Sequence, residues 1–449
     1  MILANLQRYV SSKTITGSSI NLLLSQVLIS LTFIAIDTFL AHYHFDLFPT
    51  WKQLQLLINL VLPIFAFGIP EGYKYFSAKE PHRSHYHFEF TLLGLTAVTC
   101  FFLPIAYFLL APATNYFFHH NDFRYCAIAL MLLFFGLNMN RVLRYECINN
   151  KKTNRFLIAS AASISALIGT LVLDHLILYN FPIAVRIAVI TFSIGIFYLI
   201  PLLLLSSLKP TSLQLISSQG TWKNYLQIGL PLYFASFISI IVTNIDKAWL
   251  GHFYDKNTFA LYAAAALEIP LFAMLSAAFS QSTFPEYVRL INQNLLEEAK
   301  QTWVRITTKV SYFTYPLLLL CMLFAKTIFT TVYSTAMLPG LPIFKTFLLI
   351  ALWRNNYYGA ILSAAGKSKW ISFYSFLNLG LVGLGVFLVT HYGSIQQLPW
   401  VLFLSTSSLA VLQIVHEKMF TLFLRGFVIK PFTLLLLTMI LLAYFYSPL

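Results

Sequence analysis

Charged residues are scarce in this sequence of 449 residues. Asp, Glu, Lys and Arg make up 10% of the chain, whereas 58% is hydrophobic and the mean hydropathy is +0.74. Soluble globular domains carry about 25% charged residues. The shortage excludes a water-soluble protein and predicts a chain that lies mainly in lipid.

Acidic residues are the scarcer of the two signs, with 15 Asp and Glu against 29 Lys and Arg. In a soluble protein such an excess of positive charge would suggest nucleic-acid binding. In a membrane protein it follows from the preference of Lys and Arg for cytoplasmic loops. We therefore expect no nucleic-acid partner.

The four cysteines, at positions 100, 126, 147 and 321, are isolated from one another. Without C-x-x-C spacing they indicate neither a disulfide framework nor a zinc site. The histidine groups at 82–87 and 119–120 have no regular set of carboxylate or cysteine partners in their loops. We expect no metal and no cofactor.

Catalytic motifs are missing as well. The sequence has no G-x-S-x-G and no H-E-x-x-H pattern. Residues 365–368 end like a phosphate-binding loop, but Ile361 stands where the first glycine is required. No large polar loop is present to carry a glycosyltransferase site. We expect a protein that is not an enzyme.

Long apolar runs, in contrast, are abundant. Six runs that can cross about 30 Å of hydrocarbon occupy residues 21–41, 54–73, 90–111, 125–145, 156–176 and 183–205. Six more occupy 228–251, 259–278, 310–332, 343–364, 371–391 and 400–415, and a last run covers 432–446. The runs are continuous, whereas barrel strands alternate apolar and polar residues. The prediction is an all-α membrane protein with 12 core transmembrane helices and an additional C-terminal helix.

Basic residues set the expected orientation. Most of the 29 Lys and Arg residues fall on the inner side if the N-terminus is cytoplasmic. The first apolar run has no cleavage site after it, so we expect it to be retained. The polar segment 286–309 then lies inside and has the pattern of an amphipathic helix. These observations predict a multi-pass protein of the cell inner membrane.

An internal repeat relates the two halves. Segments 36–43 and 245–253 share Ile-Asp followed by Leu, then Ala or Gly, His and an aromatic residue. The words Leu-Pro-Ile-Phe-Ala at 62–66 and Ile-Pro-Leu-Phe-Ala at 269–273 follow at nearly the same offset. Since each half holds six runs, an even number, the halves are expected to be parallel repeats. We place the lobes at 1–207 and 208–418, with 419–449 as the additional helix.

Ionisable residues inside the runs are costly and mark candidate sites. Asp37 and Asp246 occupy equivalent positions near the outer boundary, where each is either a solvated or capping carboxylate or a proton-coupling group. Glu268, just before Pro270, is either a buried hydrogen-bonded carboxyl or a proton or ligand site. Asp174 closes its run and Arg186 opens the next one, and for both a side chain that extends to the membrane interface is the simpler interpretation.

An anion site is expected from two arginines that the repeat makes equivalent. Arg354 lies midway along its run, and Arg141 is nearer a helix end, where interfacial placement remains open. A guanidinium suits phosphate or diphosphate because it donates two parallel hydrogen bonds. The amphipathic neighbours that complete the predicted substrate site are Asn138, Asn140, Asn355, Asn356 and Tyr358.

The second half resembles a known family. Gly-Leu-Pro-Leu at 229–232, Asn-Ile-Asp-Lys at 244–247, residues 250–265 and Phe-Pro-Glu-Tyr at 284–287 resemble the start of the second half of Wzx-type polysaccharide flippases. Ala-Ala-Gly-Lys-Ser-Lys at 364–369, with Ser372, Ser375 and Asn378, resembles the next segment of that family. The match is concentrated in residues 222–392.

The resemblance implies a MATE-like fold of two lobes in the multidrug, oligosaccharidyl-lipid and polysaccharide exporter superfamily. It implies as cargo a polyprenyl-diphosphate-linked oligosaccharide, moved to the outer leaflet for O-antigen or capsule assembly. Membrane lipid and other polysaccharide-assembly membrane proteins are then the expected partners. A cation-coupled multidrug antiporter, a lipid-linked peptidoglycan precursor flippase and a membrane polymerase or ligase remain as alternatives.

Overall fold

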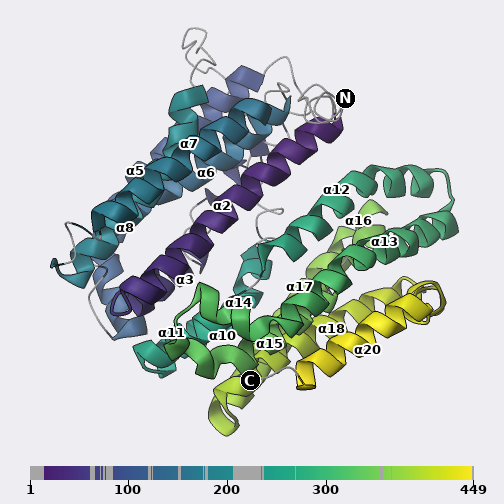
Figure 1. The fold of residues 1–449 in the computed structure, drawn as a ribbon. Coiled ribbons are helices and arrows are strands. Elements are labelled where there is room, and N and C mark those ends of the chain that lie inside the picture. Colours follow the sequence, from purple (N-terminus) through teal and green to yellow (C-terminus); the bar gives the residue numbers. More distant parts are fainter. Residues whose placement is uncertain are drawn as a thin grey trace, which may run out of the picture. The chain divides into compact units, whose positions relative to one another are not determined.

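The computed structural model describes residues 15–60, 66–70, 72–73, 76, 84–119, 123, 125–149, 153–174, 176, 180–205, 234, 237–267, 269–353, 357–365 and 367–446. Every regular element in this part of the chain is helical (Figure 1), which confirms the all-α prediction. Eight helices are long and apolar enough to cross a membrane, or nine if one bent pair is counted as a span, among the residues described.

The chain forms two compact units. The first contains Met1–Leu40, His44–Ile240 and Gly251–Lys256, and the second contains Ala41–Tyr43, Ile241–Leu250 and Asn257–Leu449. The main helices of the first unit are α2 (Ile15–Tyr43), α3 (Phe48–Leu60), α5 (Ser84–Phe118), α6 (Ala127–Asn149), α7 (Thr153–Leu173) and α8 (Ile183–Leu205).

Helix α6 is the centre of the first unit and packs against α5, α7 and α8. Of its apolar window 67% is buried, against 22% for α5, whose large side chains such as Phe108 are exposed. Two glycines allow α6 to approach α8 closely: a Cβ on Gly136 would lie 2.9 Å from the carbonyl oxygen of Gly195. Close backbone contact through small residues is the usual way in which helices associate in lipid.

The second unit is built from shorter pieces. Its helices are α10 (Ile245–Phe253), α11 (Lys256–Ala265), α12 (Pro270–Asn292), α13 (Leu296–Leu323), α14 (Ala325–Val332), α15 (Leu341–Ile350), α16 (Ala360–Ala364), α17 (Ser368–Tyr392), α18 (Leu398–His416), α19 (Phe420–Phe423) and α20 (Pro431–Tyr446). Short 3₁₀ helices cover Thr335–Gly340, Ala351–Trp353 and Ile395–Gln397, and Leu424–Val428 is a π-helical turn, η7.

Two predicted runs are interrupted in the structure, and a third is described only in part. The run 259–278 is divided into α11 and α12, because Pro270 at the first turn of α12 cannot donate to the preceding turn. The run 343–364 is divided between α15 and α16. The run 54–73 corresponds in part to α3, which begins earlier, at Phe48, and ends at Leu60.

The prediction of a separate amphipathic helix over 286–309 is wrong. Helix α12 continues to Asn292 and α13 begins at Leu296, so the polar residues are the ends of two long helices. The turn between them places Asn294 at a φ of 61°, a conformation that Asn tolerates better than most residues.

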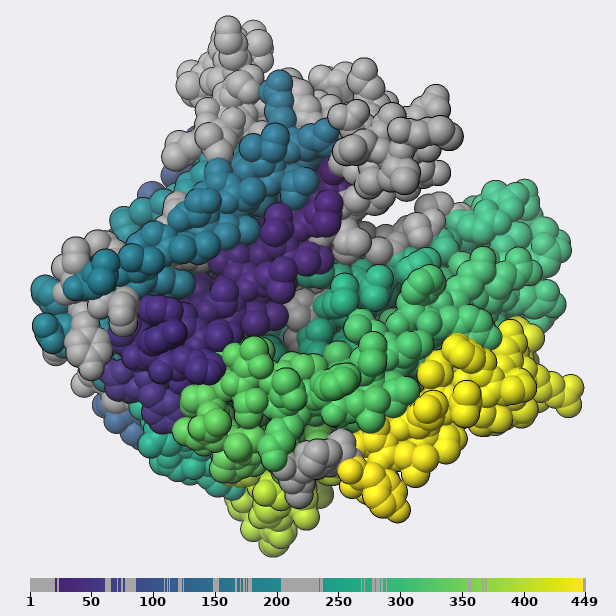
Figure 2. Space-filling view, viewed as in Figure 1, coloured from purple at the N-terminus to yellow at the C-terminus, as the bar shows by residue number. Residues whose placement is uncertain are grey.

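The C-terminal segment bends sharply. The helices over Phe420–Val428 and Pro431–Tyr446 make an angle of 81° with each other. Lys430 and Pro431 lie at the bend, and α20 packs along α13 of the same unit. Figure 2 shows this segment, in yellow, lying against the green helices.

Candidate functional site

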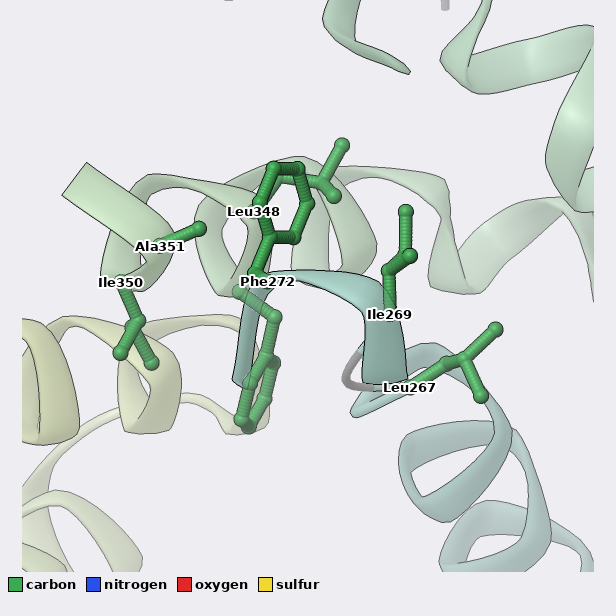
Figure 3. Close-up of a pocket in the computed structure, with 7 residues that line it drawn as sticks. Leu267, Ile269, Phe272, Leu348, Ile350 and Ala351 are labelled. Atoms are coloured by element: carbon green, nitrogen blue, oxygen red, sulfur yellow. The ribbon is translucent and has the colours of Figure 1, made fainter. Parts of the chain in front are cut away.

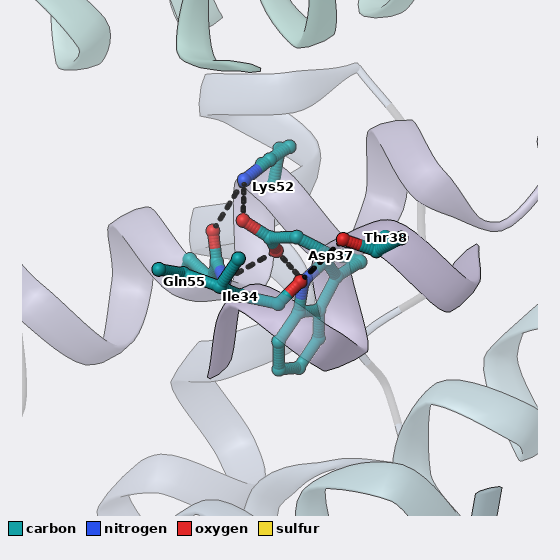
Figure 4. Close-up of polar contacts among 6 residues, drawn as sticks. Ile34, Asp37, Thr38, Lys52 and Gln55 are labelled. Carbon is teal, nitrogen blue, oxygen red and sulfur yellow. Dashed lines mark hydrogen bonds and ion pairs between the residues drawn. The ribbon is translucent and has the colours of Figure 1, made fainter. Parts of the chain in front are cut away.

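Asp37 is the centre of a buried polar cluster between α2 and α3 (Figure 4). Lys52 Nζ lies 2.5 Å from Asp37 Oδ2, and the Trp51 indole N–H donates to Oδ1 at 2.6 Å. The Gln55 amide donates to the same Oδ1 at 3.0 Å and accepts from Lys52 at 3.1 Å. Both charged residues are only 4% exposed. Of the alternatives for Asp37, a solvated carboxylate is therefore excluded, since α3 supplies it with a cation and two further donors.

Asp246 is buried in a different environment. It lies in the first turn of α10, is 0% exposed, and accepts a hydrogen bond from the Tyr262 hydroxyl of α11 at 2.6 Å. Its other oxygen, Oδ1, is buried without a hydrogen-bond partner in the described part of the chain. Asp246 is not solvated either, but, unlike Asp37, it has no cation paired with it among the described residues.

The predicted substrate residues of the first half lie on α6. Asn138 is 4% exposed and donates to the carbonyl of Phe134 at 2.9 Å, and Asn140 is 3% exposed. Arg141 is exposed, so its guanidinium is accessible, whereas the two amides are buried. The structure thus brings Asn138, Asn140 and Arg141 onto one turn of the central helix of the first unit.

Arg144 is a residue of this turn that the sequence analysis did not select as a site. It is half-buried, lies one helical turn after Arg141, and interacts electrostatically with Arg141, Tyr145 and the buried Tyr198 of α8. Its buried Nε has no hydrogen-bond partner within the described residues. The sequence did contain a signal for Arg144, because residues three apart on a helix are neighbours and Arg144 is three residues after Arg141. The two arginines concentrate positive charge on α6.

Asp174 and Arg186 form a buried ion pair, which corrects the expectation of interfacial side chains. Arg186 Nε donates to Asp174 Oδ1 at 3.2 Å and Nη2 donates to Oδ2 at 2.9 Å. The two are 0% and 1% exposed, and His44 Nε2 lies 4.0 Å from Asp174 Oδ2. The pair joins the end of α7 to the start of α8, a contact between turns that hydropathy cannot show.

The predicted site of the second half is described only in part. Arg354, Asn355, Asn356 and Glu268 lie outside the described residues. Tyr358 is 8% exposed and packs against Trp303 of α13 and against Trp353, with ring centroids 5.6 and 5.8 Å apart. The Trp303 indole N–H donates to the carbonyl of Tyr357 at 3.1 Å, which anchors this segment to α13.

A small cavity lies beside the interruption between α11 and α12 (Figure 3). Its volume is about 20 Å³, close to that of one water molecule, and its lining is apolar. The lining residues are Leu267, Ile269, Phe272, Phe347, Leu348, Ile350 and Ala351. None of these lining residues has a polar side chain, so the cavity offers a polar ligand no side-chain partner among the residues that line it.

Comparison with known proteins identifies the family. The model of the family described as "Polysaccharide biosynthesis protein" matches residues 79–340. The chain belongs to the polysaccharide biosynthesis protein family. Within this family's range lie α6, with Arg141 and Arg144, and most of the segment 222–392 that resembles the flippases. The family resemblance predicted from the sequence is confirmed.

A curated relative of this polysaccharide biosynthesis protein is the teichuronic acid biosynthesis protein TuaB of Bacillus subtilis (strain 168). The two are 21% identical over 183 residues, which are 40% of this chain and 37% of that protein. The match therefore spans well under half the length of that relative.

Solved structures share the fold of this polysaccharide biosynthesis protein. An outward-facing MATE family multidrug resistance transporter of the MOP superfamily matches with a TM-score of 0.62 at 12% identity, over 89% of this chain and 94% of that one. The lipid II flippase MurJ, in an inward closed conformation, matches with a TM-score of 0.58 at 16% identity, over 95% and 97%. The fold is therefore that of MATE and other MOP superfamily transporters.

Proposed function

We propose that this protein is a membrane flippase that moves a polyprenyl-diphosphate-linked oligosaccharide from the inner to the outer leaflet for O-antigen or capsule synthesis. The observation that carries the proposal is membership of a polysaccharide biosynthesis family together with the fold of MOP superfamily transporters. One of the proteins with this fold is described as a lipid II flippase. Transport of a lipid-linked sugar is consistent with both the family and the fold, whereas an enzyme needs a set of catalytic residues that the sequence does not contain.

The proposed architecture is two six-helix lobes, residues 1–207 and 208–418, as parallel repeats, followed by an additional helix in 419–449. The repeated words in the sequence and the shared fold support it. The protein would lie in the inner membrane with its N-terminus in the cytoplasm, where its excess of positive charge favours the inner side.

For the diphosphate we propose Arg141 and Arg144 from the first lobe and Arg354 from the second. The exposed guanidinium of Arg141 and the unpartnered Nε of Arg144 are donors without acceptors in the described part of the chain. Bidentate donors bind phosphate oxygens strongly. Asn138, Asn140, Asn355, Asn356 and Tyr358 are the proposed sugar contacts, because amides and hydroxyls match sugar hydroxyls.

For ion coupling, Asp246 is the stronger of the two repeat-related aspartates. Lys52 neutralises Asp37, whereas Asp246 has one oxygen bonded to Tyr262 and one without a partner. Asp246 therefore keeps a carboxylate oxygen that none of the described residues engages. Glu268 remains a proposed third coupling group. Protonation would shift the balance between inward-open and outward-open states.

The deciding experiment is deletion of the gene, followed by assay of surface polysaccharide and of the leaflet that holds the lipid-linked glycan. Loss of surface polymer, with single repeat units held on the cytoplasmic leaflet, is expected. Normal glycans with new sensitivity to cationic dyes would instead identify a multidrug antiporter. Cell lysis with accumulation of a peptidoglycan precursor would identify the third candidate, a flippase of that lipid.

Complementation of the deletion strain tests the site. Arg141→Gln with Arg144→Gln is expected to lower transport about tenfold or more, since each lost charge-assisted bond costs about 1.5–3 kcal/mol. The matched control is Arg155→Gln, which removes an exposed guanidinium from the first turn of α7. Normal transport by the double variant would exclude this anion site.

A further inference from the structure

A groove with three basic side chains lies in the second unit, where α13 meets the bent C-terminal segment. Its volume is about 390 Å³. From α13 it is lined by Gln301, Val304, Arg305, Thr308, Lys309 and Tyr312, and from the other wall by Leu422, Gly426 and Lys430. The groove is far larger than the apolar cavity beside Ile269 and, unlike it, offers charged donors.

Helical spacing explains why the basic groups converge. Gln301, Arg305 and Lys309 are four residues apart, so they line one face of α13 on successive turns. On the other wall Leu422, Gly426 and Lys430 have the same spacing. Lys430 stands at the bend immediately before α20, where the first turn of a helix adds positive potential.

The π-helical turn η7 holds the two walls together. A Cβ on Gly426 would lie 2.7 Å from Val304 Cγ1, so any other residue here would have to displace the Val304 side chain. The Thr308 hydroxyl lies 3.4 Å from the carbonyl oxygen of Gly426 across the same contact. Turns of this kind occur frequently at functional sites.

No ion pair with a described residue neutralises the positive charge of the groove. Arg305, Lys309 and Lys430 are exposed, and none forms an ion pair within the described residues. The nearby Lys300, by contrast, pairs with Glu297 at 2.7 Å, and Arg289 pairs with Glu286 at 2.6 Å. No acidic residue is among those that line the groove.

We propose that this groove binds the phosphate group of an anionic membrane lipid. The three cations and the Gln301 amide suit phosphate oxygens, and the apolar atoms of Tyr312, Leu422 and Val304 suit the adjoining chains. Tyr312 packs edge-on against Phe432 at 4.9 Å, which continues the apolar wall onto α20. The groove is lined by residues of the second unit alone, and the proposal does not depend on the proposed cargo.

The test uses the purified full-length protein in a neutral detergent. Phosphatidylglycerol, phosphatidylcholine and inorganic phosphate are added separately at equal ionic strength, and two quantities are measured: the thermal unfolding midpoint and the lipid retained in native mass spectrometry. We expect phosphatidylglycerol to raise the midpoint by several degrees and to be retained, and phosphatidylcholine to do neither.

Variants show whether the groove is responsible. The combined variant Arg305→Gln, Lys309→Gln, Lys430→Gln is expected to lose the response. A control with the same loss of charge, Lys367→Gln, Lys418→Gln, Arg425→Gln, changes exposed cations of the second unit that do not line the groove and should keep it. If the triple variant does not purify as a folded protein, the single variants take its place.

The outcomes separate the sources of phosphate. An equal response to inorganic phosphate, lost in the groove variant, would support a phosphate site filled from solution. A response to phosphatidylglycerol alone would assign the site to lipid. No response to either probe, or the same response in the groove and control variants, would overturn the proposal and leave the cations as ordinary interfacial residues.

Discussion

At the scale of single residues, a buried ion pair is compatible with a stable fold only while both partners are present. Lys52→Gln would leave Asp37 buried without its cation, and such a loss costs about 3–5 kcal/mol. We expect a clear fall in the thermal unfolding midpoint. Asp37→Asn combined with Lys52→Gln should recover part of it, because no uncompensated charge is left. Lys247→Gln removes a half-buried lysine that donates to the carbonyl of Thr243 at 3.3 Å and lies 6.0 Å from the centroid of the Phe347 ring, so it should change stability little. An equal fall in the unfolding midpoint of this variant would contradict the argument.

Glu417 links stability to pH. It follows the last turn of α18, outside the apolar span, and its Oε1 accepts the N–H of Leu362 at 3.2 Å. Burial raises its pKa from 4.5 to about 8, although the hydrogen bond from Leu362 and the charge of Lys300 act in the opposite direction. The folded chain therefore holds a proton that the unfolded chain releases near its ordinary pKa.

The free energy of unfolding should then fall as pH rises between about 4.5 and about 8, by at most about 1.4 kcal/mol per pH unit. Glu417→Gln keeps a neutral group at this position and removes the titration. Thermal unfolding of both proteins from pH 5 to pH 9 measures the effect. We expect the variant to be the more stable one above pH 8, and parallel curves for the two proteins would show that Glu417 does not titrate in this range.

At the scale of helices, continuous apolar runs were predictable and interruptions only partly so. The run 183–205 corresponds to α8 at both ends, because lipid imposes a length on a span. The break at Pro270 had a local signal, whereas after Ile350 the chain packs Tyr358 against Trp303 of α13, a distant contact that the local sequence does not show. The polar residues were predictable to a similar extent. Helical spacing predicts that Asn138 and Arg141 lie on one turn, whereas no periodicity in the sequence predicts the ion pair between Asp174 and Arg186, which joins two helices.

The contact between α6 and α8 gives a prediction at this scale. Gly136→Val would place side-chain atoms against the carbonyl oxygen of Gly195 and Cβ of Tyr198, 2.9 and 3.0 Å from the new Cβ. We expect a loss of about 1–3 kcal/mol from this overpacking, seen as a lower thermal midpoint. Gly169→Val in α7 is the matched control, since a Cβ there meets nothing within 4 Å. A similar loss in both variants would attribute the effect to helix propensity and not to the crossing.

At the scale of the whole molecule, the distribution of charge makes a prediction that the fold alone does not. If the N-terminus is cytoplasmic, the turn between α12 and α13 lies inside and the turn between α17 and α18 lies outside. In a variant with Cys100, Cys126, Cys147 and Cys321 replaced by alanine, Gln396→Cys should react with a membrane-impermeant maleimide in intact cells. Gln293→Cys, which is also exposed in the structure, should react only after the membrane is opened. The reverse labelling pattern would mean that the N-terminus is outside and that the whole chain has the opposite orientation. The basic groove of α13 would then lie on the outer side, and the excess of Lys and Arg on that side would have no explanation.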